Sequence, residues 1–182
     1  MSRTYRLAIV VGSNRRESIN RQLGEAMARL LPGNVEVSYP RIDDLPLYNP
    51  DLEVERPSTV VRFTDEIRAA DAVLIITPEH NRSLPAVLKN AIDWGSKPMD
   101  SNVWRDKPVA LTGTSPGAMG AALAQQHLRQ IMGILGAVVL GGEAYVQFRP
   151  ELIVDGEIGP DSREFLKGYL DRFVSLVQKL TA

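Results

Sequence analysis

A polar loop follows the first apolar run of the chain and carries side chains suited to holding an anion. Residues 7–11 are apolar, and the segment GSNRRESINR then leads into an amphipathic pattern. Gly12 permits a tight exit from a strand, and the planar guanidinium of Arg15 matches the geometry of a phosphate group. The N–H groups and dipole at the start of the following helix also favour an anion. The segment therefore predicts a phosphate-binding loop with the polar side chains Ser13, Arg15, Ser18 and Asn20.

The same loop also allows a purely structural interpretation. Ser18 can serve as the N-cap of the following helix while the arginines are solvated. Spacing alone leaves the two interpretations equally open. The patterns GxxxxGK[ST] and GxGxxG are both absent here, which argues against a nucleoside triphosphatase and against a fold built around a dinucleotide.

A second polar loop lies within TPEHNRSLPAVLKNAIDW, residues 77–94. Pro78 ends a buried strand, and Pro85 is suited to the first turn of a helix. A loop with a helix cap explains Ser83 but not the whole polar group. The pattern predicts that the edge of a planar polar ligand lies here. The polar residues between the prolines are Glu79, His80, Asn81, Arg82 and Ser83.

A third loop, TGTSPGAMGAALAQQ, contains Gly113, Gly117 and Gly120 and begins near Ser115. Glycines allow the backbone to approach a ligand closely, and tight packing of a strand against a helix explains them nearly as well. His127 lies in the helix after this loop, and we expect a packing or surface role for it.

The elements that must position these loops alternate along the chain. Apolar runs predict strands, and apolar positions at helical spacing predict helices. The expected strands are residues 5–12, 34–40, 71–78, 107–115 and 136–146. The expected helices are residues 18–31, 58–70, 84–95, 118–135 and 161–180.

This alternation predicts an α/β three-layer sandwich, in which helices cover both faces of a five-stranded parallel sheet. Right-handed crossovers leave few topologies, and the flavodoxin-like order 2-1-3-4-5 suits five strands. Ligands of such sheets bind beyond the carboxyl ends of the strands, near the switch in strand order. For this order the switch lies between strands one and three, so we expect the three loops to meet there.

Composition narrows the class of protein. The chain has 182 residues, no cysteine and a formal net charge of −1. The length favours one domain, residues 1–182. The absent cysteines exclude disulfides, zinc–thiolate sites, iron–sulfur clusters and a cysteine nucleophile. The charge balance gives no general attraction to nucleic acid or to an anionic membrane. We expect a cytoplasmic protein with no metal site.

Two blocks of sequence resemble the NADPH-dependent FMN reductases, a flavodoxin-like family that includes chromate, quinone and azo-dye reductases. One block is Gly12-Ser13-x-Arg15-x-x-Ser18-x-Asn20, and the other runs from Pro78 to Trp94. Strand and helix order match from about residue 5 to about residue 180. The family commonly has tyrosine at the position of His80, and an imidazole is smaller and changes charge near neutral pH.

The resemblance implies a tightly bound FMN and an NADPH or NADH electron donor. It assigns the FMN phosphate to Ser13, Arg15, Ser18 and Asn20. It assigns the isoalloxazine ring to Pro78, Glu79, His80, Asn81 and Ser83, and a third contact to Ser115 and Gly117. It also implies a homodimer or homotetramer with the flavin near the interface.

The resulting hypothesis is an oxidoreductase working by ping-pong hydride transfer, with quinones, flavins, azo compounds or chromate as acceptors. The cofactor carries such chemistry, so no residue is expected to be catalytic in its own right. An FMN-binding electron carrier or redox-sensing module is the alternative, because the fold supports both roles. The near-neutral charge favours the enzyme, since electron-transfer flavodoxins are often strongly acidic. A phosphate-ester hydrolase is a weaker third hypothesis, because no nucleophile or metal cluster is evident.

Overall fold

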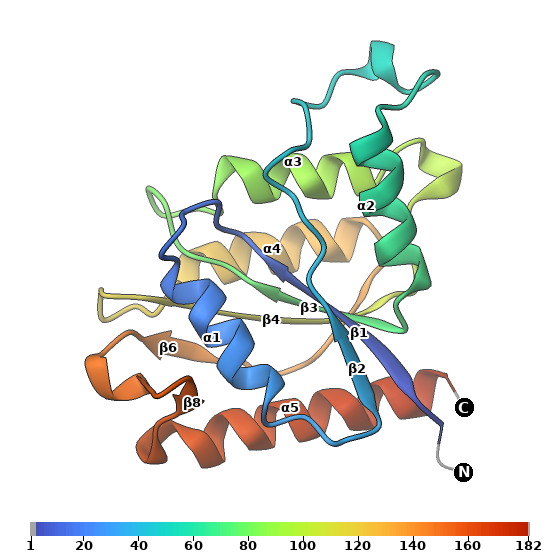
Figure 1. Ribbon diagram of the computed structural model, residues 1–182. Coiled ribbons are helices and arrows are strands. Elements are labelled where there is room, and N and C mark those ends of the chain that lie inside the picture. Colours follow the sequence, from blue (N-terminus) through green and yellow to red (C-terminus); the bar gives the residue numbers. More distant parts are fainter. Residues whose placement is uncertain (1–2, 182) are drawn as a thin grey trace.

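A computed structural model describes residues 3–181, and its centre is a parallel sheet with the strand order β2-β1-β3-β4-β5 (Figure 1). A further strand, β6, also pairs with β4. The predicted order 2-1-3-4-5 is therefore confirmed. The strands are β1 (Tyr5–Val11), β2 (Val35–Ser38), β3 (Ala72–Ile76), β4 (Pro108–Ser115), β5 (Val138–Val139) and β6 (Tyr145–Gln147).

Five α-helices cover the two faces of the sheet. In Figure 1, α1 and α5 lie on one face, and α2, α3 and α4 lie on the other. This arrangement follows from right-handed crossovers between parallel strands. The helices are α1 (Ile19–Ala28), α2 (Ser58–Ala69), α3 (Ala86–Gly95), α4 (Ala122–Ile134) and α5 (Pro160–Leu180).

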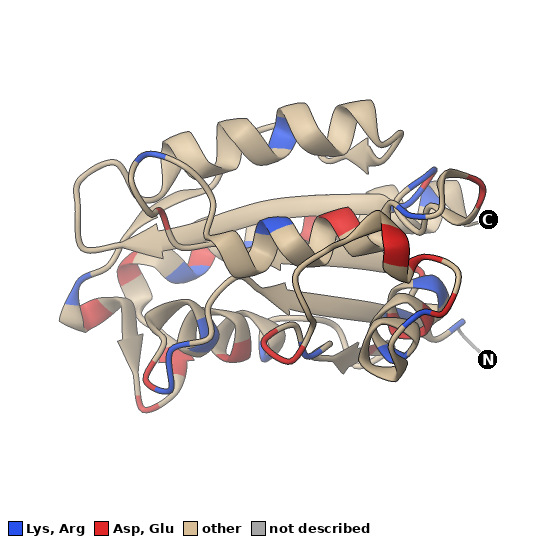
Figure 2. Cartoon of the chain, turned by 90° about the horizontal axis from the view of Figure 1, so that it is seen from above, with Lys and Arg blue, Asp and Glu red and all other residues tan. Residues whose placement is uncertain are grey.

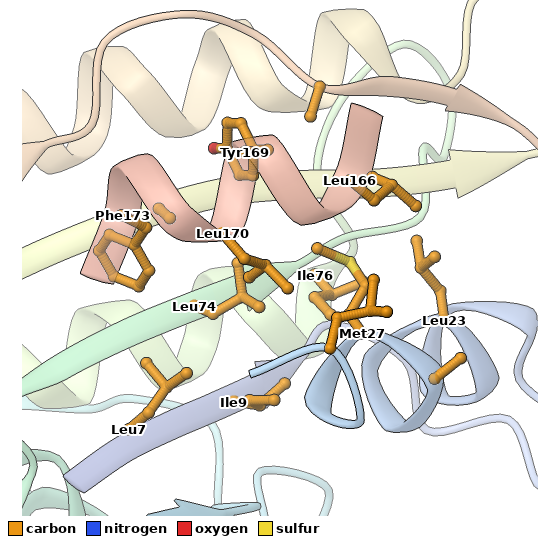
Figure 3. Close-up of a cluster of buried hydrophobic side chains, with 14 of the residues drawn as sticks. Leu7, Ile9, Leu23, Met27, Leu74, Ile76, Leu166, Tyr169, Leu170 and Phe173 are labelled. Carbon is orange, nitrogen blue, oxygen red and sulfur yellow. The ribbon is translucent and has the colours of Figure 1, made fainter. Parts of the chain in front are cut away.

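The central strands are apolar on both faces because helices bury both faces. Alternate residues of β1 and β3 supply the two cores. Figure 3 shows one core, in which Leu7 and Ile9 of β1 and Leu74 and Ile76 of β3 lie against side chains of α1 and α5. The intervening residues, such as Val10 and Ile75, belong to the second core under α2, α3 and α4.

The fifth strand position is interrupted, which the continuous run at residues 136–146 did not predict. β5 pairs with the start of β4, and β6 pairs with its end. Between them the main chain leaves the sheet, and Tyr169 of α5 takes its place. The buried Tyr169 hydroxyl accepts a hydrogen bond from the Leu111 N–H at 3.1 Å and donates one to the Leu111 carbonyl at 2.7 Å. One phenol thus satisfies two backbone groups that a continuous strand would have paired.

Shorter elements complete the chain. The 3₁₀ helices are η1 (Pro50–Leu52), η2 (Met99–Ser101) and η3 (Pro150–Leu152). A small antiparallel hairpin joins β7 (Ile153–Val154) to β8 (Glu157–Ile158). Its turn residues Asp155 and Gly156 both have positive φ, as a two-residue hairpin turn requires. No helix within residues 3–181 is long and apolar enough to cross a membrane.

Basic and acidic positions are interspersed around the sheet rather than gathered on one face (Figure 2). The distribution agrees with the formal net charge of −1. Any anion-binding capacity of this chain must therefore be local, and it must come from particular loops.

Candidate functional site

The loops after β1, β3 and β4 lie together at the carboxyl edge of the sheet (Figure 1). This edge also contains the switch point, because β1 lies between β2 and β3 in the sheet. The structure thus brings together the three segments that the sequence singled out.

The loop after β1 is organised by its serines. The Ser18 hydroxyl accepts a hydrogen bond from the Arg21 N–H at 3.2 Å and is the N-cap of α1. The Ser13 hydroxyl accepts from the Arg15 N–H at 3.3 Å. Helix geometry leaves the first N–H groups of α1, those of Ile19 and Asn20, without intrahelical acceptors. The loop therefore presents backbone donors beside the exposed guanidinium of Arg15, which suits an anion.

Asn20 has a structural task that its spacing did not reveal. Its side-chain amide donates to the Thr114 carbonyl and accepts from the Thr114 N–H, both at 2.9 Å. Asn20 is 1% exposed and Thr114 is fully buried. β3 ends before it can pair with this part of β4, so the amide takes the place of the missing peptide group. Asn20 can therefore meet a ligand at the edge only through its backbone N–H.

The loop after β3 contains a strained two-residue turn. His80 and Ser83 exchange backbone hydrogen bonds, each at 2.9 Å. The central residues Asn81 and Arg82 have φ values of 49° and 64°. Left-handed backbone at a residue other than glycine costs about 1–2 kcal/mol. His80, Asn81 and Arg82 are exposed at the tip of this turn.

Two side chains fasten this turn to α4. A carboxylate oxygen of Glu79 accepts hydrogen bonds from the Leu123 N–H at 3.0 Å and the Ala124 N–H at 3.4 Å. The hydroxyl of Ser83 lies 2.9 Å from Nδ1 of His127. The expected surface role of His127 therefore includes a contact with the loop. Because the Glu79 carboxylate caps α4, Glu79 can contact a ligand mainly through its backbone.

The glycines of β4 and of the loop after it have different roles. A Cβ on Gly113 would lie 1.9 Å from the Thr77 carbonyl oxygen, so close packing of β3 and β4 requires glycine there. A Cβ on Gly120, where φ is +53°, would lie 2.7 Å from the backbone of Val146. Packing thus explains both residues. A Cβ on Gly117 would meet only the Ser115 hydroxyl, at 3.8 Å, so this exposed position is free to approach a ligand.

The motif at residues 85–94 holds a distant loop in place. The Asn90 side chain accepts from the Tyr48 N–H at 2.8 Å and donates to the Pro46 carbonyl at 2.9 Å. The indole N–H of Trp94 also donates to the Pro46 carbonyl, at 2.7 Å. Lys89 and Asp93 form an ion pair on the exposed face of α3, at 2.7 Å. Asn90 and Trp94 therefore hold the segment that contains Pro46 and Tyr48 in place.

Sequence reasoning missed the loop after β2. Together with the loop after β1, it lines a cleft of about 370 Å³. Arg41 in the cleft forms two hydrogen bonds with Asp43, at 2.7 and 3.2 Å, which hold the pKa of that carboxyl below its usual range. β2 is parallel to β1, so its carboxyl end lies at the same edge of the sheet. That rule could have identified the loop from the sequence.

Comparison with known proteins now decides the family. Residues 5–150 match the family described as NADPH-dependent FMN reductase. The chain belongs to the NADPH-dependent FMN reductase family. It is therefore an oxidoreductase, and FMN and a reduced nicotinamide nucleotide are the cofactors of this family.

Known proteins of similar sequence and structure match this chain over almost its whole length. A quinone reductase of Pseudomonas putida is 45% identical over 98% of this chain and 97% of its own. A 2-hydroxy-1,4-benzoquinone reductase of a Burkholderia species is 42% identical, over 95% of this chain and 96% of its own. The flavoenzyme NAD(P)H:(acceptor) oxidoreductase FerB of Paracoccus denitrificans has 42% identity and a TM-score of 0.92, covering 97% of this chain and 98% of its own.

The residues at the carboxyl edge fit the FMN of the family. Arg15 and the N–H groups that begin α1 supply donors for a phosphate monoester. The Thr114 hydroxyl is buried at the same edge and has no hydrogen-bond partner within residues 3–181. The exposed turn after β3 and the open backbone at Gly117 leave room for a planar ring.

Proposed function

We propose that this chain is an FMN-dependent NAD(P)H oxidoreductase that reduces quinones. Flavins, azo compounds and metal oxyanions such as chromate are further acceptors under this proposal. Support comes from membership of the family, from relatives named quinone reductase at 44–45% identity, and from the arrangement of the carboxyl edge.

The observation that carries the proposal is the pre-organised loop after β1. Its serine hydroxyls are occupied in holding the loop and the helix end, so the loop has its shape before any ligand binds. Arg15 is exposed, and the N–H groups that begin α1 have no intrahelical acceptor. We assign the FMN phosphate to the loop of Ser13, Arg15, Ser18 and Asn20. Ser18 and Asn20 contribute mainly through their backbone N–H groups and by fixing the shape of the loop.

The isoalloxazine ring would lie against the turn after β3 and the loop after β4. Glu79 and Ser83 fasten the turn to α4, while His80 and Asn81 remain exposed beside it. A strained turn persists only where its surroundings fix it, and here α4 supplies that restraint. We assign the ring contacts to Pro78, Glu79, His80, Asn81 and Ser83, and to Ser115 and Gly117 on the opposite loop.

The protein residues bind and orient rather than react. When bound, FMN supplies hydride acceptance from NAD(P)H and electron donation to an acceptor in a second half-reaction. The chain must hold the phosphate, fix the ring and leave one face of the ring open. The exposed tips of the loops after β3 and β4 meet the last requirement.

Steady-state kinetics tests the proposal. The protein, saturated with FMN, should oxidise NADH or NADPH in the presence of 1,4-benzoquinone. Double-reciprocal plots at several quinone concentrations should give parallel lines, as a ping-pong mechanism requires. Turnover that stays at the level of free FMN, with flavin bound, would favour the alternative of an electron carrier or redox-sensing module.

We also propose a homo-oligomer, a dimer or a tetramer. Three large apolar side chains of the segments flanking α2 and α3 support it, since Leu47 is 81% exposed, Val54 is 97% exposed and Met99 is 71% exposed. Light scattering coupled to size-exclusion chromatography tests it, and a 20.1 kDa particle would contradict it. A cytoplasmic location is proposed as well, and cell fractionation tests it.

A further inference from the structure

The cleft between the loops after β1 and β2 is unusually basic for a nearly neutral protein. Its lining includes four arginines, Arg15, Arg16, Arg21 and Arg41. Arg41 is paired with Asp43, which also lines the cleft. The guanidinium groups of the other three form no ion pair within residues 3–181. Positive charge is thus concentrated at one hollow, where the Asp43 carboxylate is paired with Arg41 and also lies near enough to Arg21 for that charge to lower its pKa.

The cleft also has an aromatic wall. Tyr39, directly after β2, is 38% exposed and lines it. Burial is the main cause that raises the pKa of this phenol, followed by the charge of Glu25, while Arg21 lowers it. Tyr39 is therefore a neutral ring next to guanidinium groups. Such a ring can stack on a nucleobase, and arginines bind phosphate through two parallel hydrogen bonds.

The volume of the cleft and its place beside the FMN phosphate loop further limit which ligand it can bind. Sites for small molecules commonly measure about 300–1,000 Å³, so about 370 Å³ suits one half of a dinucleotide rather than the whole. Ser13 and Arg15 line this cleft and also belong to the proposed FMN phosphate loop. A dinucleotide whose nicotinamide meets the flavin could extend along that shared wall into the cleft.

We propose that this cleft binds the phosphorylated adenosine half of NADPH, with Arg21 and Arg41 contacting the 2′-phosphate and Tyr39 contacting the base. The choice of NADPH as the ligand rests on the proposed function. The cleft would be the part of this chain that distinguishes NADPH from NADH. Arg21 projects from the first turn of α1 and Arg41 from the loop after β2, so the two lie outside the residues assigned to FMN. Binding must overcome the negative charge of Asp43.

Calorimetric titration of the FMN-loaded protein with 2′,5′-ADP tests the proposal, with 5′-AMP as the probe that lacks the 2′-phosphate. We expect the wild-type protein to bind 2′,5′-ADP at least about tenfold more tightly than 5′-AMP. Arg21→Ala and Arg41→Ala should each weaken 2′,5′-ADP binding about tenfold, the loss expected for one charge-assisted contact. Flavin content per chain should stay unchanged. Asp43→Asn should strengthen binding, whereas loss of a merely structural residue would weaken it.

Arg105→Ala is the matched control, because Arg105 precedes β4 at the opposite edge of the sheet. It should leave the titration unchanged. In turnover, the ratio of kcat/KM for NADPH to that for NADH should fall about tenfold in Arg21→Ala. Equal binding of 2′,5′-ADP by wild type, Arg21→Ala and Arg41→Ala would overturn the proposal. Loss of FMN from Arg21→Ala would also overturn it, since the cleft would then hold the flavin phosphate.

The two proposals fail separately. A protein that binds 2′,5′-ADP through Arg21 and Arg41 but oxidises neither dinucleotide would support the adenosine site and contradict the proposed enzyme. A protein that oxidises both dinucleotides equally well, with no effect of Arg21→Ala, would support the enzyme and contradict the site.

Discussion

Replacement of Asn20 by alanine separates a structural role from a role in phosphate binding. The side-chain amide forms two hydrogen bonds of 2.9 Å with the backbone of Thr114. Alanine would leave a buried N–H and a buried carbonyl without partners. Each orphaned group costs about 1–3 kcal/mol, so two could cost about 2–6 kcal/mol. The space left by the amide admits a water that recovers part of this, and we expect about 2–4 kcal/mol.

Urea denaturation of the FMN-free protein measures this effect, because without ligand only the structural role can contribute. A loss of about 2–4 kcal/mol corresponds to a fall in Tm of roughly 5–15 °C for a chain of this length. Asn14→Ala is the control, since it makes the same chemical change at an exposed position of the same loop. That variant should stay within about 0.5 kcal/mol of wild type.

The opposite result would refute the reasoning. If Asn20→Ala unfolds like Asn14→Ala but loses FMN affinity, the amide acts on the ligand and the Thr114 contact contributes nothing measurable. If the prediction holds, FMN affinity should fall as well, because the contact joins the loop that starts α1 to the strand that carries Ser115.

Three further changes test other parts of the site and fold. Arg15→Ala should weaken FMN binding about tenfold or more, as measured by fluorescence titration. Urea denaturation should show a free energy of unfolding within about 0.5 kcal/mol of that of wild type. FMN binding as tight as that of the control Arg105→Ala would reject the phosphate assignment. Glu79→Ala should lower the free energy of unfolding by about 1–2 kcal/mol through loss of the α4 cap, and Glu79→Gln, which keeps an acceptor oxygen, by about half as much. Unchanged stability of Glu79→Ala would show that the cap does not matter. Tyr169→Phe should cost about 2–6 kcal/mol because both Leu111 backbone groups lose their partner, whereas Tyr5→Phe should cost little. Burial raises the pKa of Tyr169, so the unfolded chain releases this proton first and wild-type stability should fall above about pH 10, with a smaller slope in Tyr169→Phe.

The elements of the fold were predictable because their signals are local. Each buried strand is a run of apolar residues, and each helix has apolar residues at helical spacing. The strand order was predictable because right-handed crossovers leave few choices. The expected helix at residues 118–135 begins only at Ala122, because left-handed backbone at Gly120 and Ala121 precedes it. The Asp155-Gly156 dipeptide is a hairpin signal that could have identified β7 and β8.

The particular tasks of the site residues were not predictable, because they depend on distant partners. Glu79 caps α4 by accepting from the N–H of Leu123, which lies 44 residues later in the chain. Asn20 pairs with a residue 94 positions away, and Tyr169 fills a gap in a strand that reads as continuous. A short polar residue in a loop suits a ligand and a backbone group equally well, so its residue type cannot distinguish the two. Spacing singled out three loops that the fold brings to one edge of the sheet, and the fold determined which of their side chains remain available.

The visible spectrum of the purified protein, recorded anaerobically, tests the central proposal most directly. We predict about one FMN per chain, released by heat and identified by its mass, with absorbance near 450 nm that NADPH bleaches and 1,4-benzoquinone restores. A colourless protein that also fails to bind added FMN would contradict the account, and so would a bound flavin that neither NADPH nor NADH reduces.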